Sequence, residues 1–215
     1  MAVIFPRWTN KIPQFLAVGG PIVLIGVVSF VWYFASPWFT DVGYQPKQPV
    51  EFSHALHAGE LGLDCRYCHN AVEVSAHAAV PPTATCMNCH ASIKVKSEKL
   101  ALVRDSAKTG KPIPWVRVHM VPDYAFFDHS VHVAAGVGCA SCHGRIDKME
   151  TVQQDQPLSM SWCLDCHRNP TPHLRPKDQV TNMRYNPATA GYNPAGDPAR
   201  TRELAPPTHC SGCHR

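Results

Sequence analysis

The chain has 215 residues, 20 of them proline and 10 cysteine, and a formal charge of +4. So small an excess of Lys and Arg forms no basic surface for nucleic acid, and we expect no nucleic-acid partner. A hydrophobic content of 45% excludes a disordered chain. Proline at nearly twice its ordinary frequency of about 5% predicts few long regular elements.

Residues 12–40 contain no Asp, Glu, Lys or Arg. This run exceeds the ~20 apolar residues that cross a bilayer as a helix, so we predict a transmembrane helix over 12–40. Arg7 and Lys11 precede the run and Asp41 follows it. By the positive-inside rule, residues 1–11 are then cytoplasmic and residues 41–215 lie on the outer side. A cleaved signal peptide is the alternative, although its apolar region usually spans only about 7–15 residues.

All ten cysteines fall in five copies of Cys-x-x-Cys-His. Two thiols three positions apart lie on one side of a helical turn, where they can add to the two vinyl groups of one porphyrin. The following His then faces the iron. Zinc sites and disulfides do not require a His after every pair, so the pattern predicts five covalently attached c-type haems. The attachment cysteines are Cys65, Cys68, Cys86, Cys89, Cys139, Cys142, Cys163, Cys166, Cys210 and Cys213, and the proximal iron ligands are His69, His90, His143, His167 and His214.

The five attachment units are organised by an internal repeat. Residues 52–57 (Phe-Ser-His-Ala-Leu-His) and 127–132 (Phe-Asp-His-Ser-Val-His) each precede two units. Repeated units of this kind determine the architecture of a chain. We therefore predict a dihaem module over 50–93, a linker over 94–118 with a short helix from Lys94 to Leu102, a second dihaem module over 119–169, and a Pro-rich arm with the fifth unit over 170–215.

Each iron has a second axial position, usually filled by His or Met. The two histidines of His-x-x-His share nearly one face of a helix and can reach two different irons. The repeat therefore predicts His54, His57, His129 and His132 as distal ligands, and His119 is the fifth candidate because the sequence suggests no other role for it. The alternatives are Met160, Met183, His77, His173 and His209.

The predicted outer part, 41–215, provides about 35 residues for each haem. Pieces below about 40 residues need external staples because they cannot build a core of their own. We therefore expect a mostly α, irregular domain in which the haems are the core. Ten ionised propionates and five ferric centres would change the formal charge from +4 to about −1, and to about −6 on reduction. Arg66, Arg168 and Arg175 are candidates for pairing with propionates.

The anchor, the order of the units, residues 52–57 and two further segments resemble the pentahaem cytochrome c subunit of bacterial alternative complex III. These segments are 81–90 (Pro-Pro-Thr-Ala-Thr-Cys-Met-Asn-Cys-His) and 157–170 (Pro-Leu-Ser-Met-Ser-Trp-Cys-Leu-Asp-Cys-His-Arg-Asn-Pro). The resemblance implies a complex of the bacterial inner membrane that oxidises quinol, with this haem domain in the periplasm. It implies as partners an iron–sulfur subunit, polytopic quinol-binding subunits, a monohaem cytochrome c and a terminal oxidase. The dihaem segments also resemble class III multihaem cytochromes, in which the two lead-in histidines are distal ligands.

These observations favour an electron-transfer subunit without a catalytic residue of its own. A membrane-anchored multihaem quinol dehydrogenase is the alternative, because only residues 41–51 separate the predicted anchor from the first lead-in. A multihaem reductase would need an iron with an open axial position. Five proximal and five distal candidates disfavour that third possibility.

Overall fold

The structure is a computed structural model that describes residues 6–35, 41–197 and 205–215. It divides into two units, Met1–Asp41 and Val42–Arg215. The first unit contains one long helix, and the second contains all five attachment units.

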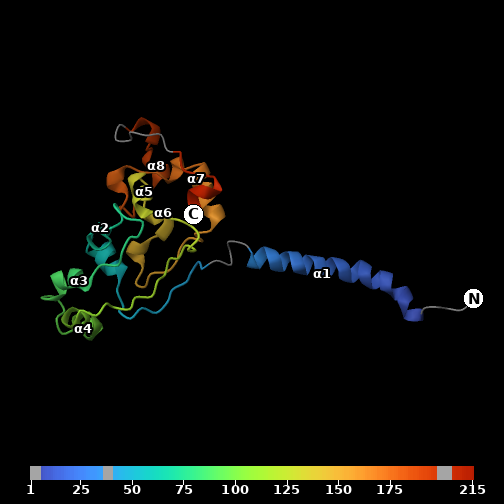
Figure 1. Cartoon of the computed structure of the whole chain (residues 1–215), viewed down its shortest axis with the longest axis horizontal. Helices are drawn as coiled ribbons and strands as arrows, with labels where there is room; N and C mark the ends of the chain where they lie inside the picture. The colour runs from blue at the N-terminus through green and yellow to red at the C-terminus, as the bar shows by residue number, and fades with distance from the viewer. Residues whose placement is uncertain (1–5, 36–40, 198–204) are drawn as a thin grey trace, which may run out of the picture. The chain divides into compact units, whose positions relative to one another are not determined.

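The first unit begins with a 3-10 turn, η1 (Arg7–Lys11), which leads into α1 (Ile12–Phe34) (Figure 1). This segment is long and apolar enough to cross a membrane, and a signal sequence near an N-terminus meets the same criteria. The predicted span of 12–40 is too long for the described helix, because Ala35 is already a turn. Residues 36–40 lie outside the described residues. Pro37 is consistent with the end of the helix, because helices usually end at or before the residue that precedes a proline.

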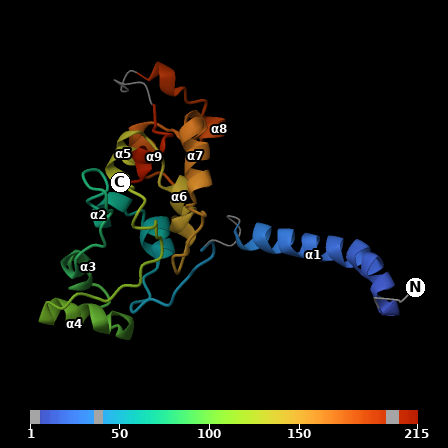
Figure 2. The same ribbon diagram turned by 45° about the vertical axis from the view of Figure 1, so that its right-hand side comes forward.

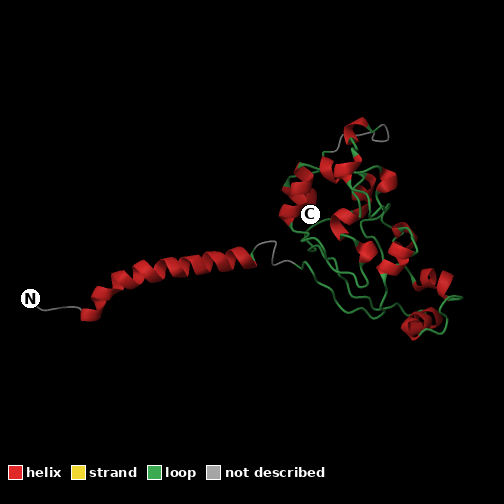
Figure 3. Ribbon diagram, turned by 180° about the vertical axis from the view of Figure 1, so that it is seen from behind, coloured by secondary structure: helices red, strands yellow, loops and turns green. Residues whose placement is uncertain are grey.

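The second unit consists of short helices joined by long loops, and its described part contains no β-strand (Figure 3). Two isolated β-bridges join Ala125 to His214 and Val137 to Leu174. The prediction of a mostly α, irregular domain without a sheet is confirmed. The helices are η3 (Ala55–Glu60, a π-helix), α2 (Cys65–Cys68), α3 (Thr83–His90), η4 (Glu98–Leu100), α4 (Ala101–Thr109), α5 (His129–Ala134), α6 (Ala140–His143), η5 (Ile146–Lys148), α7 (Met160–Arg168), η6 (Thr171–His173), η7 (Lys177–Gln179), α8 (Pro187–Ala190), η8 (Pro194–Gly196) and α9 (Cys210–Cys213).

The helix expected between Lys94 and Leu102 forms later in the chain. Lys94 has a φ of 55°, a left-handed conformation that no α-helix contains. A 3-10 turn at Glu98–Leu100 then leads into α4, Ala101–Thr109. The helix ends at Gly110, whose φ of 73° provides a left-handed cap at no steric cost.

A small apolar core supports the second attachment unit. Val50, Val103 and Ile113 form a buried cluster, against which Cys86 and Met87 of α3 pack. This cluster holds α3 against α4 (Figure 2). Among the described residues, the other buried apolar side chains are Val118, Leu174 and Val180.

Candidate haem-binding sites

All five attachment units lie on helical turns. The first is on α2, the second ends α3, the third is on α6, the fourth is inside α7 and the fifth is on α9. None of the ten cysteines, all of which the structure describes, forms a disulfide. No three His, Cys, Asp or Glu side chains of the described ranges converge to hold a metal ion by themselves. Each unit supplies two thiols for covalent attachment and one imidazole for an iron, which is the donor set of a c-type haem.

The two lead-in segments share one geometry. The Phe52 ring contacts His54 edge-on at 4.8 Å between centroids and stacks on His57 at 4.4 Å. The Phe127 ring meets His129 edge-on at 4.8 Å and His132 at 4.6 Å. The phenyl ring thus fixes the orientation of both histidines in each module.

Most of the predicted iron ligands hold Nδ1 against a backbone carbonyl. A neutral imidazole that donates from Nδ1 keeps its lone pair on Nε2, where a metal can bind. Of His77, His173 and His209, none shows this contact in the described structure, and His209 Nδ1 lies 3.1 Å from Ser211 Oγ instead. The carbonyl contacts are His57 to Ser53 (2.8 Å), His69 to Ala79 (2.7 Å), His90 to Ile93 (3.1 Å), His129 to Ala76 (2.8 Å), His132 to Asp128 (2.7 Å), His167 to Pro207 (2.7 Å) and His214 to Tyr124 (3.1 Å).

Three lead-in histidines each face an attachment histidine at nearly the same separation. A metal–imidazole bond is about 2.0 Å and a ring centroid lies about 1.1 Å behind its nitrogen, so two imidazoles on opposite sides of one iron have centroids roughly 6.3 Å apart. The three facing pairs therefore leave the room that one iron needs between two imidazoles. The separations are 6.2 Å for His57 and His90, 6.3 Å for His129 and His143, and 6.1 Å for His132 and His167.

His54 is the fourth lead-in histidine. Its Nδ1 is buried and has no hydrogen-bond partner among the described residues. Burial, together with the nearby His69 and His57 rings, lowers its pKa to about 4. The ring is therefore neutral at pH 7, and the influence of His69 indicates that it lies near the first attachment unit.

His119 lies beside an attachment histidine rather than facing one. Its Nε2 is 3.3 Å from Nδ1 of His143, and the two rings are nearly perpendicular with centroids 4.4 Å apart. That separation is too short for an iron between the rings. Burial lowers the pKa of His119, and burial and neighbouring histidines, His119 first among them, lower that of His143 to about 3.

The fifth unit is held by residues 124–126. His214 forms a β-bridge with Ala125, and the Tyr124 ring stacks on its imidazole at 5.9 Å. Phe126 N donates to the Cys213 carbonyl at 2.6 Å. Met160, a candidate ligand in the sequence, is 66% exposed, whereas Met183 is half-buried. Neither observation tests their predicted role.

Contacts within the haem-binding part connect the first and second units and the first and third. Asn88 Nδ2 donates to Tyr67 Oη at 3.0 Å and joins the second unit to the first. The Cys65 thiol lies against that of Cys139, which joins the first unit to the third. Residues 180 and 181 strengthen this junction, because Thr181 donates to Asp64 at 2.8 Å and Cys139 N donates to the Val180 carbonyl at 3.1 Å.

The third, fourth and fifth units follow in the same series. Burial, together with the nearby Cys166 and Cys163, raises the pKa of the Cys142 thiol to about 12. Burial raises the pKa of Cys163 as well, with Cys213 of the fifth unit as the next cause. The attachment units therefore follow one another in space in the order second, first, third, fourth, fifth.

Two of the three predicted propionate partners have carboxylate partners within the protein. Arg66 pairs with Asp64 at 2.9 Å and with Glu73 at 3.2 Å. Arg168 lies 3.8 Å from Asp165. Arg175 is buried at 2% exposure, donates to the Asn182 carbonyl and lies over the Tyr185 ring.

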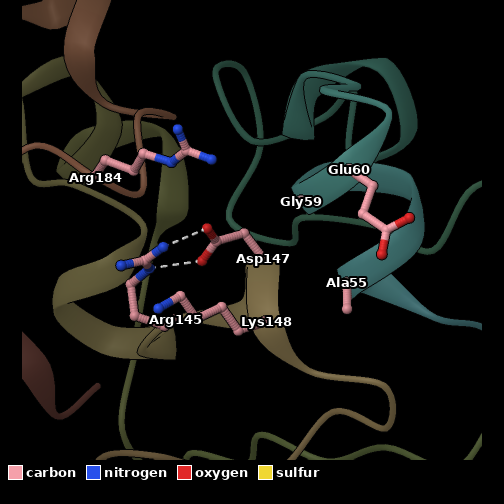
Figure 4. A pocket seen from close by; sticks show the side chains of 7 residues that line it. All are labelled: Ala55, Gly59, Glu60, Arg145, Asp147, Lys148 and Arg184. Atoms are coloured by element: carbon pink, nitrogen blue, oxygen red, sulfur yellow. Dashed lines mark hydrogen bonds and ion pairs between the residues drawn. The ribbon is translucent and has the colours of Figure 1, made fainter.

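A cavity of about 500 Å³ lies where η3 meets η5 (Figure 4). Arg145 and Asp147 form a two-bond ion pair on one wall, with distances of 2.7 and 2.6 Å. Gly59 closes the other wall, and a Cβ built there would lie 2.2 Å from the Asp147 carbonyl oxygen. The glycine therefore permits η3, which carries His57, to approach the turn that follows His143.

The sequence did not reveal the carbonyl acceptors or the Asp64–Thr181 bridge. Most of these contacts join residues far apart in the chain, such as His214 and Tyr124, so no local pattern marks them. The phenylalanines of the two lead-ins were visible in the repeat, and the structure shows that they pack on the histidines.

Comparison with known proteins identifies the family of the chain. Residues 125–215 match the family of cytochrome c7 and related cytochromes c, and residues 39–113 match the class III cytochrome c family. The chain belongs to the class III-type multihaem cytochromes c, which bind c-type haem covalently and transfer electrons.

Two characterised proteins are similar to this chain in sequence. The chain is 31% identical over 168 residues to the multihaem cytochrome c subunit of menaquinone reductase from Nitratidesulfovibrio vulgaris, an alignment that covers 68% of this chain and 78% of that protein. It is 30% identical over 118 residues to the cytochrome c-type protein NrfB of Escherichia coli. This second alignment covers 49% of this chain and 55% of NrfB.

Proposed function

We propose that the chain is an electron-transfer subunit of a respiratory membrane complex that oxidises quinol, and that it relays electrons through five c-type haems. A c-type haem supplies an iron that cycles between the ferric and ferrous states. The observation that carries the proposal is the set of three facing imidazole pairs with centroids 6.1 to 6.3 Å apart. Two strong imidazole ligands favour electron transfer over substrate binding, because they leave no open axial position.

The ligand assignment follows the repeat. His69, His90, His143, His167 and His214 bind from the attachment side. His57, His129 and His132 bind the second, third and fourth irons from the opposite side. His54 takes the first iron, supported by its proximity to His69.

Haems as the core are supported by how little apolar side chain is buried without them. The described part of Val42–Arg215 buries six apolar side chains. Many large apolar side chains stay exposed, among them Val74 at 83% and Val131 at 61%. Exposed surface of this kind would lose contact with water against porphyrin rings, at about 25 cal/mol per Å².

The series of attachment units supports a relay. Its contacts run from the second unit through the first, third and fourth to the fifth, and the Cys65–Cys139 contact joins the first unit to the third. Electrons would then enter and leave at these two ends.

The location follows from α1 and the charges around it. We propose that α1 is an uncleaved anchor in a bacterial inner membrane, with the N-terminus in the cytoplasm and the haem domain in the periplasm. Its exposed apolar side chains, such as Phe15 at 70% and Ile25 at 66%, support burial in lipid. The partners would be an iron–sulfur subunit, polytopic quinol-binding subunits and a monohaem cytochrome c, with electrons passing to a terminal oxidase.

A stand-alone quinol or quinone oxidoreductase is the second candidate. It is favoured by the short stretch between α1 and Phe52 and by the relative named as a subunit of menaquinone reductase. That name also raises the question of direction, because a relay of haems can pass electrons toward a quinone or away from a quinol.

The test is purification of the tagged full-length chain from membranes in mild detergent. We expect other membrane subunits to co-purify and the complex to oxidise menaquinol. The isolated chain should not oxidise it. Menaquinol oxidation by the isolated chain would establish the second candidate, and menaquinone reduction by the complex without the reverse reaction would overturn the proposed direction.

A further inference from the structure

The third attachment unit differs from the other four in what its histidine contacts. At His69, His90, His167 and His214 the Nδ1 atom lies against a backbone carbonyl. At His143 the corresponding partner is a side chain, the imidazole of His119, with Nε2 at 3.3 Å. A second imidazole thus occupies the position that a peptide oxygen has in the other units.

The geometry separates this contact from iron ligation. His129 already faces His143 at 6.3 Å with the two rings almost parallel, at 6°. His119 is perpendicular to His143, at 83° and 4.4 Å, and it approaches through the nitrogen on the other side of that ring. Its own Nε2 is directed at a protein nitrogen and would have to turn away to meet a metal.

We propose that His119 is a positioning residue, whose Nε2 accepts the Nδ1–H hydrogen bond of the attachment histidine His143. This inference rests on the proposed binding of the third haem between His143 and His129. It assigns to His119 a role outside the iron's coordination shell. The sixth ligand of the fifth iron then has to come from another residue.

The surrounding residues hold the His119 ring in this place. Arg117 Nε donates to the His119 carbonyl at 3.1 Å, and the preceding Val118 is buried. Asp155 lies close enough for its negative charge to act on the His119 ring. The Asp155 carboxylate reaches this place because residue 144 is glycine: a Cβ there would lie 2.4 Å from the Asp155 Cγ.

Such a contact affects the iron through its ligand. A hydrogen bond accepted from Nδ1–H increases the basicity of the imidazole and fixes its orientation. A more basic ligand stabilises the ferric state and lowers the reduction potential. Removal of the acceptor should therefore raise the potential of the third haem and leave its two ligands in place.

The experiment compares His119→Ala and His119→Gln in the full-length holoprotein. Haem content, the low-spin and high-spin absorption bands, and a redox titration of all haems are measured against wild type. We expect unchanged haem content, no new high-spin haem, and an upward shift of one potential in the Ala variant. The Gln variant keeps an acceptor oxygen, so its potential should shift less than that of the Ala variant. If the Ala variant does not accumulate, the Gln variant is compared with wild type instead.

Two controls define the outcomes. His132→Ala removes a proposed ligand and should produce a high-spin haem, whereas Lys99→Ala, a change at an exposed side chain outside every candidate ligand set, should change neither spin state nor potentials. A high-spin, cyanide-binding haem in the His119 variants would show that His119 is an iron ligand and overturn the inference. Unchanged potentials in both variants would overturn it as well. A wild-type protein without facing-histidine, low-spin haems would instead contradict the proposed function.

Discussion

The two dihaem modules have the same plan but are built with different local structure. In each, a phenylalanine packs on two histidines three residues apart, at 4.4 to 4.8 Å. In the first module His54 caps and His57 lies within a π-helix, Ala55–Glu60, whereas both histidines of the second lie in an α-helix, His129–Ala134. The helical form therefore varies while the ring contacts are kept, which indicates that the position of the imidazoles is the feature that matters.

The modules also differ in how their attachment histidines are held. Both attachment histidines of the first module contact backbone carbonyls close in sequence, at Ala79 and Ile93. In the second module His143 contacts His119, 24 positions away, and His167 contacts the Pro207 carbonyl, 40 positions away. The second module thus spans longer separations in the chain, and its His167 depends on a residue outside the module, Pro207.

The largest expected effect is the loss of a haem from the middle of the series. Cys139→Ala with Cys142→Ala removes the third unit, which contacts the first and fourth. We expect little holoprotein to accumulate. Without this haem, apolar surface in the shared interior is no longer buried, which removes stabilisation on the order of several kcal/mol. The matched variant Cys210→Ala with Cys213→Ala removes the terminal unit and should give a stable four-haem protein. Haem-stained gels and haem quantification measure both, and equal yields would contradict a central role for the third unit.

A smaller effect is expected from the distal ligands of the second module. His132→Ala should convert one haem to high spin, because His167 would then bind its iron alone. His132→Met should remain low-spin and raise one potential on the order of 0.1 V, within the roughly 0.8 V range that axial ligands span. Visible spectra and redox titration measure these changes. Lys99→Ala, at an exposed side chain, is the control, and a His132→Ala protein without a high-spin haem would contradict the assignment of His132.

The smallest effect concerns the helical difference between the lead-ins. Gly59 of η3 corresponds to Ala134 of α5 in the repeat. Because a Cβ at residue 59 would lie 2.2 Å from the Asp147 carbonyl oxygen, Gly59→Ala should lower the free energy of unfolding by about 1–3 kcal/mol. Denaturant titration measures the loss. The reverse change, Ala134→Gly, should cost only about 0.5–1 kcal/mol, and a cost at residue 59 no larger than that would refute the steric explanation.

The parts of this architecture that the sequence predicts are those carried by local chemistry. The Cys-x-x-Cys-His spacing places each unit on a helical turn, and the lead-in repeat predicts which histidines can share an iron. The absence of a sheet in the described residues follows from proline content and short segments. The expected helix from Lys94 to Leu102 differs from the observed one at Ala101–Thr109. Lys94 has a left-handed backbone conformation, which a lysine in the sequence does not indicate.

Contacts between residues far apart in the chain could not be predicted from the sequence motifs. No local pattern indicates that His119 lies beside His143, because an iron ligand and a hydrogen-bond acceptor can both be a histidine. Nor does one indicate that Thr181 contacts Asp64 across 117 positions. Both depend on how loops fold back over the attachment units.

The most direct test of the account is the number of haems covalently bound to one chain. Intact-mass spectrometry of the purified full-length protein, combined with thiol alkylation after denaturation, measures it. We predict the 23.7 kDa polypeptide carrying five haems, with no cysteine alkylated. A mass with fewer haems, or any alkylated cysteine, would contradict the assignment of all ten cysteines to haem attachment.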